Sequence, residues 1–305
     1  MPMQKDLEEL VEKYRPLTRE GKTAGYIPEL EGMNPDSLGI TVVTGDGQVY
    51  RAGDCLESFT LQSISKVMTL ILALMDNGKE AVFDKVGMEP TGDPFNSIYK
   101  LEMRQPGKPL NPMINAGALV VSSLIEGSTM DRRIERVLEL VRAMADNPDI
   151  HVNEKVYRSE KDTGYRNRSL AYFLKEFDII DDVEETLDLY FRQCSISVKC
   201  LDLARMGLCL AQSGQNVSGE QVVPVRLARV VKTFMVTCGM YNASGEFAIK
   251  AGIPAKSGVS GGIMASVPHR MGIGVFGPAL DEKGNSIAGF SLLADLSRKH
   301  HLSIF

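Results

Sequence analysis

The most constraining stretch of the sequence is a run of apolar residues, Ile64 to Met75, with one lysine inside it. Apolar side chains recur there at helical spacing, and most of the remaining positions are apolar as well. This pattern predicts a helix that is buried on most of its circumference. A charged Lys66 in such a helix is unfavourable unless it is paired or loses its proton. The chain must therefore fold around a buried lysine.

Ser63 precedes Lys66 by three residues, so both side chains project from one face of the predicted helix. Ser63 also stands near the helix N-terminus, where unpaired backbone N–H groups favour developing negative charge. A hydroxyl beside an amine of lowered pKa is a common way to generate a nucleophile. The S-x-x-K spacing occurs in serine acyl-transfer enzymes, although it also arises by chance in many chains. We interpret Ser63 and Lys66 as a candidate nucleophile and base.

Predicted strands lie at both ends of the chain, and predicted helices lie between them. Residues 39–44 and 48–51 are expected to form a hairpin. Later strands are predicted over 252–256, 261–267, 271–276 and 287–293, with a closing helix over 293–305. Helices are predicted over 7–17, from Ser63 to a stop at Asn77-Gly78, from Met113, and over 132–145, 169–177, 183–191, 201–212 and 224–238. The polar segment 153–168 is expected at the surface or in a cleft.

The simplest packing of these elements is an α/β (α+β) fold with one antiparallel sheet built from both chain ends. We predict a single catalytic domain, 1–305. Its sheet lobe would comprise about 1–62 and 245–305, and its inserted all-helical lobe about 63–244. Ser63 would lie at the junction of the two lobes, where clefts tend to form.

Bulk properties exclude several functional classes. The net charge of −5 gives no general attraction to nucleic acid or to an anionic membrane. The N-terminal residues lack the apolar core of a signal peptide, and no apolar run approaches membrane-spanning length. The five cysteines form no C-x-x-C pair, and the four histidines form no ligand pattern. We expect a cytoplasmic protein with reduced thiols and without a metal site or cofactor.

Two glycine motifs are better explained by structure than by catalysis. Residues 258–262 match the G-x-S-x-G nucleophile elbow, but Pro268 follows too soon for the long helix that the elbow requires. Few residues also remain after Ser260 for the rest of a triad. Residues 272–277 match G-x-G-x-x-G, but Pro278 follows and no helix opens there. We interpret these glycines as allowing tight packing within a strand.

The triplet Lys256-Ser257-Gly258 is more informative. In S-x-x-K enzymes a K-[ST]-G triplet lies late in the chain, on a strand that edges the active site. Here it follows an apolar strand signal and precedes another. The early S-x-x-K, the late triplet, the helical insertion and the strands at both ends together indicate the architecture of penicillin-recognising serine hydrolases.

Longer motifs resemble one family within that architecture. The chain is similar to serine-dependent, β-lactamase-related glutaminases in four segments: Leu61-Gln62-Ser63-Ile64-Ser65-Lys66, Asn111-Pro112-Met113-Ile114-Asn115-Ala116-Gly117-Ala118, Cys238-Gly239-Met240-Tyr241 and Pro254-Ala255-Lys256-Ser257-Gly258-Val259-Ser260-Gly261-Gly262. The resemblance runs from about Tyr14 to the C-terminus. Without ankyrin repeats or a long N-terminal extension, the chain resembles the compact bacterial form.

The resemblance implies hydrolysis of L-glutamine to L-glutamate and ammonia, with Ser63 as nucleophile, Lys66 as base and Tyr241 as a proton relay. It implies that the backbone N–H groups of Ser63 and Val259 form the oxyanion hole. The implied substrate contacts are Tyr26, Ser63, Asn115, Glu160, Asn167, Tyr190, Tyr241 and Val259. Glu160 is suited to the substrate ammonium, and the family suggests a homo-oligomer, either a dimer or a tetramer. Each of these residues could instead have a purely structural role; Tyr190, for example, could be an aromatic residue of the hydrophobic core.

Two other functions share the fold. One is hydrolysis of β-lactams or peptides, which is usually an extracytoplasmic activity and therefore fits poorly with the absence of an export signal. The other is a non-catalytic glutamine sensor or assembly protein, against which the intact Ser63 and Lys66 pair argues.

Overall fold

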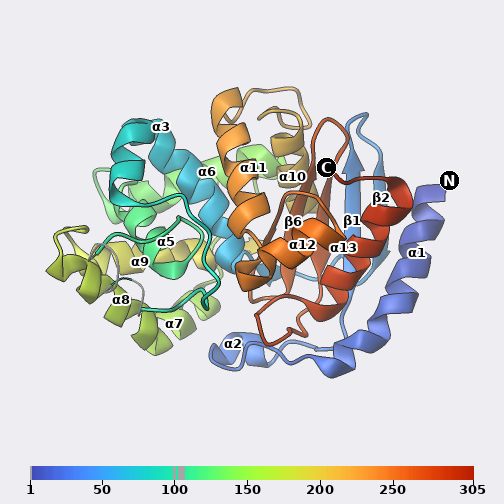
Figure 1. Ribbon diagram of the computed structural model, residues 1–305, viewed down its shortest axis with the longest axis horizontal. Helices are drawn as coiled ribbons and strands as arrows, with labels where there is room; N and C mark the ends of the chain where they lie inside the picture. Colours follow the sequence, from blue (N-terminus) through green and yellow to red (C-terminus); the bar gives the residue numbers. More distant parts are fainter. Residues whose placement is uncertain (1, 99–100, 102–106) are drawn as a thin grey trace.

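The computed structural model describes residues 2–98, 101 and 107–305. Within them the main sheet has five antiparallel strands in the order β2-β1-β7-β6-β5. These are β1 (Gly39–Thr44), β2 (Val49–Gly53), β5 (Ala255–Ser257), β6 (Gly262–Val267) and β7 (Met271–Phe276). The central pair joins the two chain ends, with Val42 opposite Ile273. The predicted hairpin and the predicted sheet from both termini are therefore confirmed (Figure 1).

Helices cover both faces of this sheet. On one face lie α1 (Pro2–Tyr14), α12 (Ser244–Lys250) and α13 (Ile287–His300), which share a hydrophobic cluster with Ile273 and Val275. On the other face lies α10 (Cys200–Ala211). A Cβ on Gly272 would stand 1.9 Å from the Ala204 carbonyl oxygen, and one on Gly274 would stand 2.1 Å from that of Cys200. Gly272 and Gly274 of the G-x-G-x-x-G match therefore lie within a strand, as predicted, and they allow α10 to pack closely against it.

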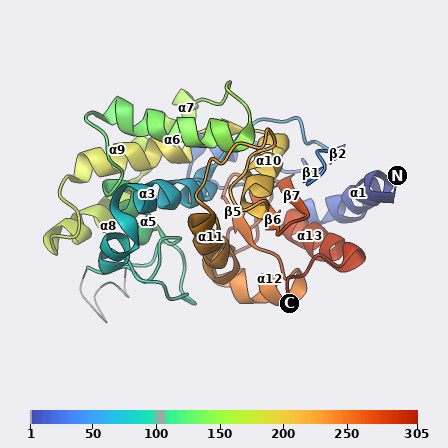
Figure 2. The ribbon, with the colours of Figure 1, turned by 90° about the horizontal axis from the view of Figure 1, so that it is seen from above.

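The helical layer is organised around α3 (Ser65–Lys85). Every residue from Ile64 to Leu74 is buried, which confirms the buried helix predicted from the sequence. Its neighbours are α5 (Asn115–Ser123), α6 (Met130–Ala145) and α11 (Val225–Cys238). The predicted stop at Gly78 is a break with non-helical backbone angles, after which the helix resumes. Figure 2 shows this layer beside the sheet.

The remaining elements surround the junction of the two layers. Helices α7 (Glu154–Thr163), α8 (Tyr165–Glu176) and α9 (Val183–Cys194) lie at the edge of the helical layer. Most of the polar segment 153–168 is therefore helical, because it falls within α7 and the start of α8. The other elements are short. They are the 3-10 helices Arg15–Glu20, Gln62–Ile64 (η2) and Tyr241–Ala243 (η3), helix α2 (Pro28–Glu31), and the paired strands β3 (Phe59–Thr60) and β4 (Ser197–Val198).

One predicted strand is wrong. Residues 287–293, which we predicted as a strand, form the first half of α13. The Ser286 hydroxyl caps this helix by accepting from the Gly289 N–H at 3.2 Å. Buried Ala288, Leu292 and Leu296 then recur every four residues on the side that packs against the sheet. The short apolar run is therefore explained by helical rather than strand periodicity.

The division into lobes stays a prediction. Helix α10 belongs to the segment assigned to the helical lobe, but it packs against β1, β6 and β7. In the described residues no helix combines the length and the apolar character needed to cross a membrane.

Candidate active site

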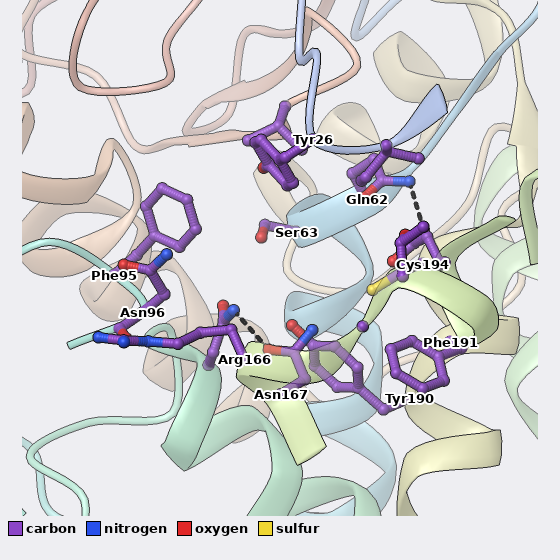
Figure 3. Close-up of a pocket in the computed structure, with 16 residues that line it drawn as sticks. Tyr26, Gln62, Ser63, Phe95, Asn96, Arg166, Asn167, Tyr190, Phe191 and Cys194 are labelled. Carbon is purple, nitrogen blue, oxygen red and sulfur yellow. Dashed lines mark hydrogen bonds between the residues drawn. The ribbon is translucent and has the colours of Figure 1, made fainter. Parts of the chain in front are cut away.

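A pocket lies where the helical layer meets the sheet, and its empty space, with the open mouth included, is about 620 Å³. The η2 turn before α3 contributes Gln62 and Ser63, and helices α5, α7, α8 and α9 contribute much of the remaining wall (Figure 3). The turn between β5 and β6 contributes Val259. The lining residues are Tyr26, Ile27, Gln62, Ser63, Phe95, Asn96, Asn115, Glu160, Thr163, Gly164, Arg166, Asn167, Tyr190, Phe191, Cys194 and Val259.

The pocket brings together most of the residues that the sequence singled out. The seven that line it are Tyr26, Ser63, Asn115, Glu160, Asn167, Tyr190 and Val259. Lys66 and Tyr241 do not line it; both are buried behind its wall. Tyr26 is the most accessible of the set, with 58% of its surface exposed.

Ser63 is held at the start of α3 by an unusual backbone turn. The preceding Gln62 has a φ of 49°, a left-handed conformation that few residues other than glycine adopt. The Gln62 side chain stabilises this backbone turn by donating to Glu160 Oε1 at 2.7 Å and to Thr60 Oγ1 at 3.2 Å. The Ser65 hydroxyl also donates to the Gln62 carbonyl at 2.8 Å. This turn presents Ser63 to the pocket, as Figure 3 shows.

Lys66 is completely buried one helical turn after Ser63. Its amine donates to Asn115 Oδ1 at 2.7 Å and to the Met113 carbonyl oxygen at 3.2 Å. Burial lowers the pKa of Lys66 to about 8, and the nearby Glu160 acts in the opposite direction. A substantial fraction of this lysine is therefore neutral near pH 8. In the described part of the chain, Lys66 makes no hydrogen bond with Ser63.

Asn115 connects the lysine to the far wall of the pocket. Its amide group donates to Asn167 Oδ1 of α8 at 2.9 Å while its own oxygen accepts from Lys66. The Asn115 N–H donates to the Phe95 carbonyl at 2.9 Å, which fixes the first turn of α5. An uninterrupted chain of hydrogen bonds therefore runs from Lys66 to Asn167.

Glu160 is a buried carboxyl group on α7. It accepts from Gln62 at 2.7 Å and from the Ser195 hydroxyl at 3.5 Å. Burial raises its pKa to about 7, and these hydrogen bonds and Lys66 only partly oppose the effect. A positively charged ligand group in the pocket would favour its ionised form.

Tyr241 stands in η3 with a φ of 52° and is buried against Phe95, whose ring centre is 4.6 Å away. Burial raises the pKa of Tyr241, and the adjacent Ser63 and Ser257 hydroxyls act in the opposite direction. The phenol oxygen nevertheless makes no hydrogen bond of complete geometry within the described residues. The phenol is therefore close to Ser63 and has an unused hydrogen-bonding capacity.

Val259 lies in a tight turn between β5 and β6. The Gly258 N–H donates to the Gly262 carbonyl at 2.9 Å, and Gly258 lies so near Leu61 that a Cβ would stand 2.5 Å from its carbonyl oxygen. This contact sets the turn against the Ser63 segment. Among the described residues the Val259 N–H has no partner. The Ser260 hydroxyl instead donates to the Thr60 carbonyl at 2.6 Å.

Sequence reasoning missed several residues at this site. Gln62 is adjacent to Ser63, and Cys194 follows Tyr190 by four residues on the same helix, so both could have been found from spacing. Phe95 lies in a loop and carries no sequence signal. In the described residues, no group of three or more His, Cys, Asp or Glu side chains is placed to hold a metal ion.

Comparisons with known proteins point to one family. A family model described as Glutaminase matches residues 21–305. A glutaminase of Bacillus cytotoxicus is 57% identical over 302 residues, which cover 98% of this chain and 98% of that protein. The crystal structure of a probable glutaminase of Bacillus subtilis superimposes with a TM-score of 0.94 at 44% identity and covers 100% of this chain and 98% of that one.

Another solved structure is the covalent complex of a Bacillus subtilis glutaminase with 5-oxo-L-norleucine, formed by reaction with 6-diazo-5-oxo-L-norleucine. It superimposes with a TM-score of 0.89 at 42% identity and covers 99% of each chain. These likenesses confirm the predicted β-lactamase-like fold class. Because the family model and the relatives span nearly the whole sequence, the chain belongs to the glutaminase family.

Proposed function

We propose that this amidohydrolase converts L-glutamine to L-glutamate and ammonia through a glutamyl ester on Ser63. The observation that carries the proposal is the position of Ser63 in the pocket, one turn before a buried lysine whose pKa is about 8. The glutaminase names of the relatives support the substrate. The covalent complex of the Bacillus subtilis relative supports an enzyme nucleophile.

Ser63 Oγ attacks the carboxamide carbon while Lys66 accepts the hydroxyl proton. Lys66 must be neutral for this step, and its burial supplies the neutral form. The amine must also turn from Asn115 Oδ1 towards Ser63 when substrate binds. Catalytic hydrogen bonds often tighten only in the complex with substrate, so the present geometry is compatible with this movement.

The tetrahedral intermediate carries an oxyanion that needs preorganised donors. We assign this role to the backbone N–H groups of Ser63 and Val259, because the Val259 turn is packed against the Ser63 segment and its N–H is unpaired among the described residues. Losing one such donor typically costs about 3 kcal/mol of transition-state stabilisation.

Collapse of the intermediate breaks the C–N bond and requires a proton on the departing nitrogen. Tyr241 is suited to pass the proton from Lys66 to that nitrogen, since its phenol is close to Ser63 and lacks a competing partner. A water molecule then hydrolyses the ester and returns Ser63 to its free form.

The remaining pocket residues suit the amino-acid end of the substrate. The ammonium would pair with Glu160, and the polar contacts would come from Asn115, Asn167 and Tyr26. Tyr190 forms part of the apolar wall beside Lys66, with its ring centre 6.0 Å from the amine.

Ammonia release from L-glutamine and L-asparagine tests this proposal. We expect wild-type protein to release ammonia, Ser63→Ala to abolish release and Lys66→Ala to reduce it strongly. A pocket discriminates one methylene by only about 1–3 kcal/mol, so slow turnover of asparagine is compatible with the proposal. Glutamine left intact by wild-type protein between pH 6 and 9, with or without phosphate, would refute it. Labelling of Ser63 by a fluorescent penicillin would favour a β-lactam-hydrolysing enzyme instead.

A further inference from the structure

A second cleft adjoins the candidate active site, and the proposed reaction of glutamine does not use it. We call it the outer cleft; its empty space, with the open mouth included, is about 1110 Å³. Tyr26, Phe95, Asn96 and Val259 line both this cleft and the pocket that contains Ser63. The two cavities therefore meet at these four side chains, so a molecule longer than glutamine could occupy both.

One wall of the outer cleft is the turn 281–285, which contributes Asp281, Glu282 and Gly284. The Asp281 carboxylate fixes this turn by accepting from two of its backbone N–H groups, each at 2.9 Å. A Cβ on Gly284 would stand 3.6 Å from the Tyr241 ring and 3.6 Å from the Val259 side chain. The wall of the outer cleft is therefore packed against the proposed proton relay and the proposed oxyanion turn.

The orientation of the substrate decides which of its ends faces the outer cleft. Glu160, which we assign to the substrate ammonium, accepts a hydrogen bond from Gln62 at 2.7 Å. Figure 3 shows Gln62 on one side of Ser63 and Phe95 on the other. A substrate with its ammonium at Glu160 and its carbonyl at Ser63 therefore directs its leaving nitrogen towards Phe95. A substituent on that nitrogen would extend into the outer cleft, since Phe95 lines both cavities.

The charges of the outer cleft indicate what kind of substituent it suits. Its charged side chains are three carboxylates and one amine, from Glu20, Asp281, Glu282 and Lys22. The neighbouring Lys283 pairs with Glu246 of α12 at 3.1 Å and not with these carboxylates. A cleft lined mainly by one sign of charge attracts groups of the opposite sign. Leu280 and Phe95 add apolar surface, which suits a chain of methylene groups that ends in a cation.

We propose that the outer cleft is a leaving-group site, and that the enzyme also hydrolyses γ-glutamyl amides of linear diamines. The inference rests on the proposed function, because the glutamyl half binds and reacts as glutamine does. Ser63 Oγ bonds to the carbonyl carbon, the C–N bond breaks, and the serine proton passes through Lys66 and Tyr241 to the departing nitrogen. Water then hydrolyses the ester, so one amide and one water molecule give glutamate and the free diamine.

Three γ-glutamyl amides with substituents of equal length test the proposal: those of a terminal diaminobutane, of butylamine and of the terminal aminobutanoate. Glutamate release by wild-type protein measures kcat/KM for each. We expect the cationic amide to exceed the neutral one by about 3–10-fold, and the neutral one to exceed the anionic one similarly, because exposed charges interact weakly. Salt at about 0.5 M should reduce both ratios, since it screens exposed charges.

A double variant, Glu20→Gln with Glu282→Gln, tests the charge of the cleft. Both side chains are exposed and lie outside the proposed chemistry, so kcat/KM for glutamine should stay within about twofold of wild type. The preference for the cationic amide should largely disappear, and Glu282→Arg should favour the anionic amide instead. Glu12→Gln with Glu176→Gln is the matched control, because it removes two exposed carboxylates outside the cleft.

Protein that hydrolyses glutamine but releases glutamate from none of the three amides would overturn the proposal. Hydrolysis without charge preference, or a preference that the double variant leaves unchanged, would show that the substituent does not occupy the outer cleft. Failure of the proposed function has a different signature, because wild-type protein would then release no ammonia from glutamine itself.

Discussion

The amine of Lys66 is hydrogen-bonded to the amide oxygen of Asn115 at 2.7 Å, and not to the hydroxyl of Ser63. The proposed base must therefore break its hydrogen bond with Asn115 before it can accept the proton of the Ser63 hydroxyl. Asn115 holds the amine in this orientation, so a charge introduced at position 115 would act directly on Lys66.

Asn115→Asp should move the activity to higher pH. In the wild type, kcat should rise with pH and level off above about 8, because only neutral Lys66 accepts a proton. A carboxylate beside the amine favours its charged form and should raise this midpoint by about 1–2 units. A pH profile of kcat measures the shift, and Asn34→Asp, which adds the same charge on an exposed loop, should leave it unchanged. Coincident profiles for wild type and Asn115→Asp would contradict the assignment of Lys66 as base.

Lys66→Met should strongly reduce activity and change how the free energy of unfolding depends on pH. The pKa of Lys66 is depressed from 10.5 to about 8 in the folded state, so between these values the unfolded chain binds more protons than the native one. Wild-type stability should therefore rise across this window relative to Lys66→Met, by about 3 kcal/mol from pH 7 to pH 10.5. Urea unfolding of both proteins at the two pH values measures this difference. A difference that does not vary with pH would show that Lys66 keeps its ordinary pKa.

Tyr241→Phe should separate activity from stability. The phenol oxygen has no complete hydrogen bond among the described residues, so its removal should leave the free energy of unfolding within about 1 kcal/mol of wild type. Loss of a proton relay should lower kcat by roughly 10²–10⁴-fold. Steady-state kinetics and thermal unfolding test both statements, with the exposed Tyr165→Phe as control. Full activity in Tyr241→Phe would assign the relay to another group.

Ser260→Ala should retain activity, in contrast to Ser63→Ala. Ser260 is buried and donates to the Thr60 carbonyl, so its loss should cost about 1–2 kcal/mol of stability and leave kcat within a few-fold of wild type. Ammonia release and urea unfolding of the two serine variants distinguish the roles. If Ser260→Ala were inactive although folded, the G-x-S-x-G interpretation would have to be reopened.

Much of the fold could be predicted because the relevant signals are local. The period of 3.6 around Lys66 and the β-branched run around Val42 are both visible in short stretches of the sequence. The strand prediction for residues 287–293 was wrong because a short apolar segment fits a strand as well as a buried helix. The cap by Ser286 and the packing of apolar side chains against the sheet stabilise the helix instead.

The sequence by itself determined that a serine and a lysine share one face of a buried helix, and that strands from both chain ends form the sheet. Local periodicity and spacing are sufficient for both. Only the tertiary structure decided which groups surround that pair. Gln62 reaches Glu160 across 98 positions of sequence, and Lys256 lies under a tyrosine on a separate segment. Such contacts depend on how whole elements pack, and no local pattern in the chain encodes them.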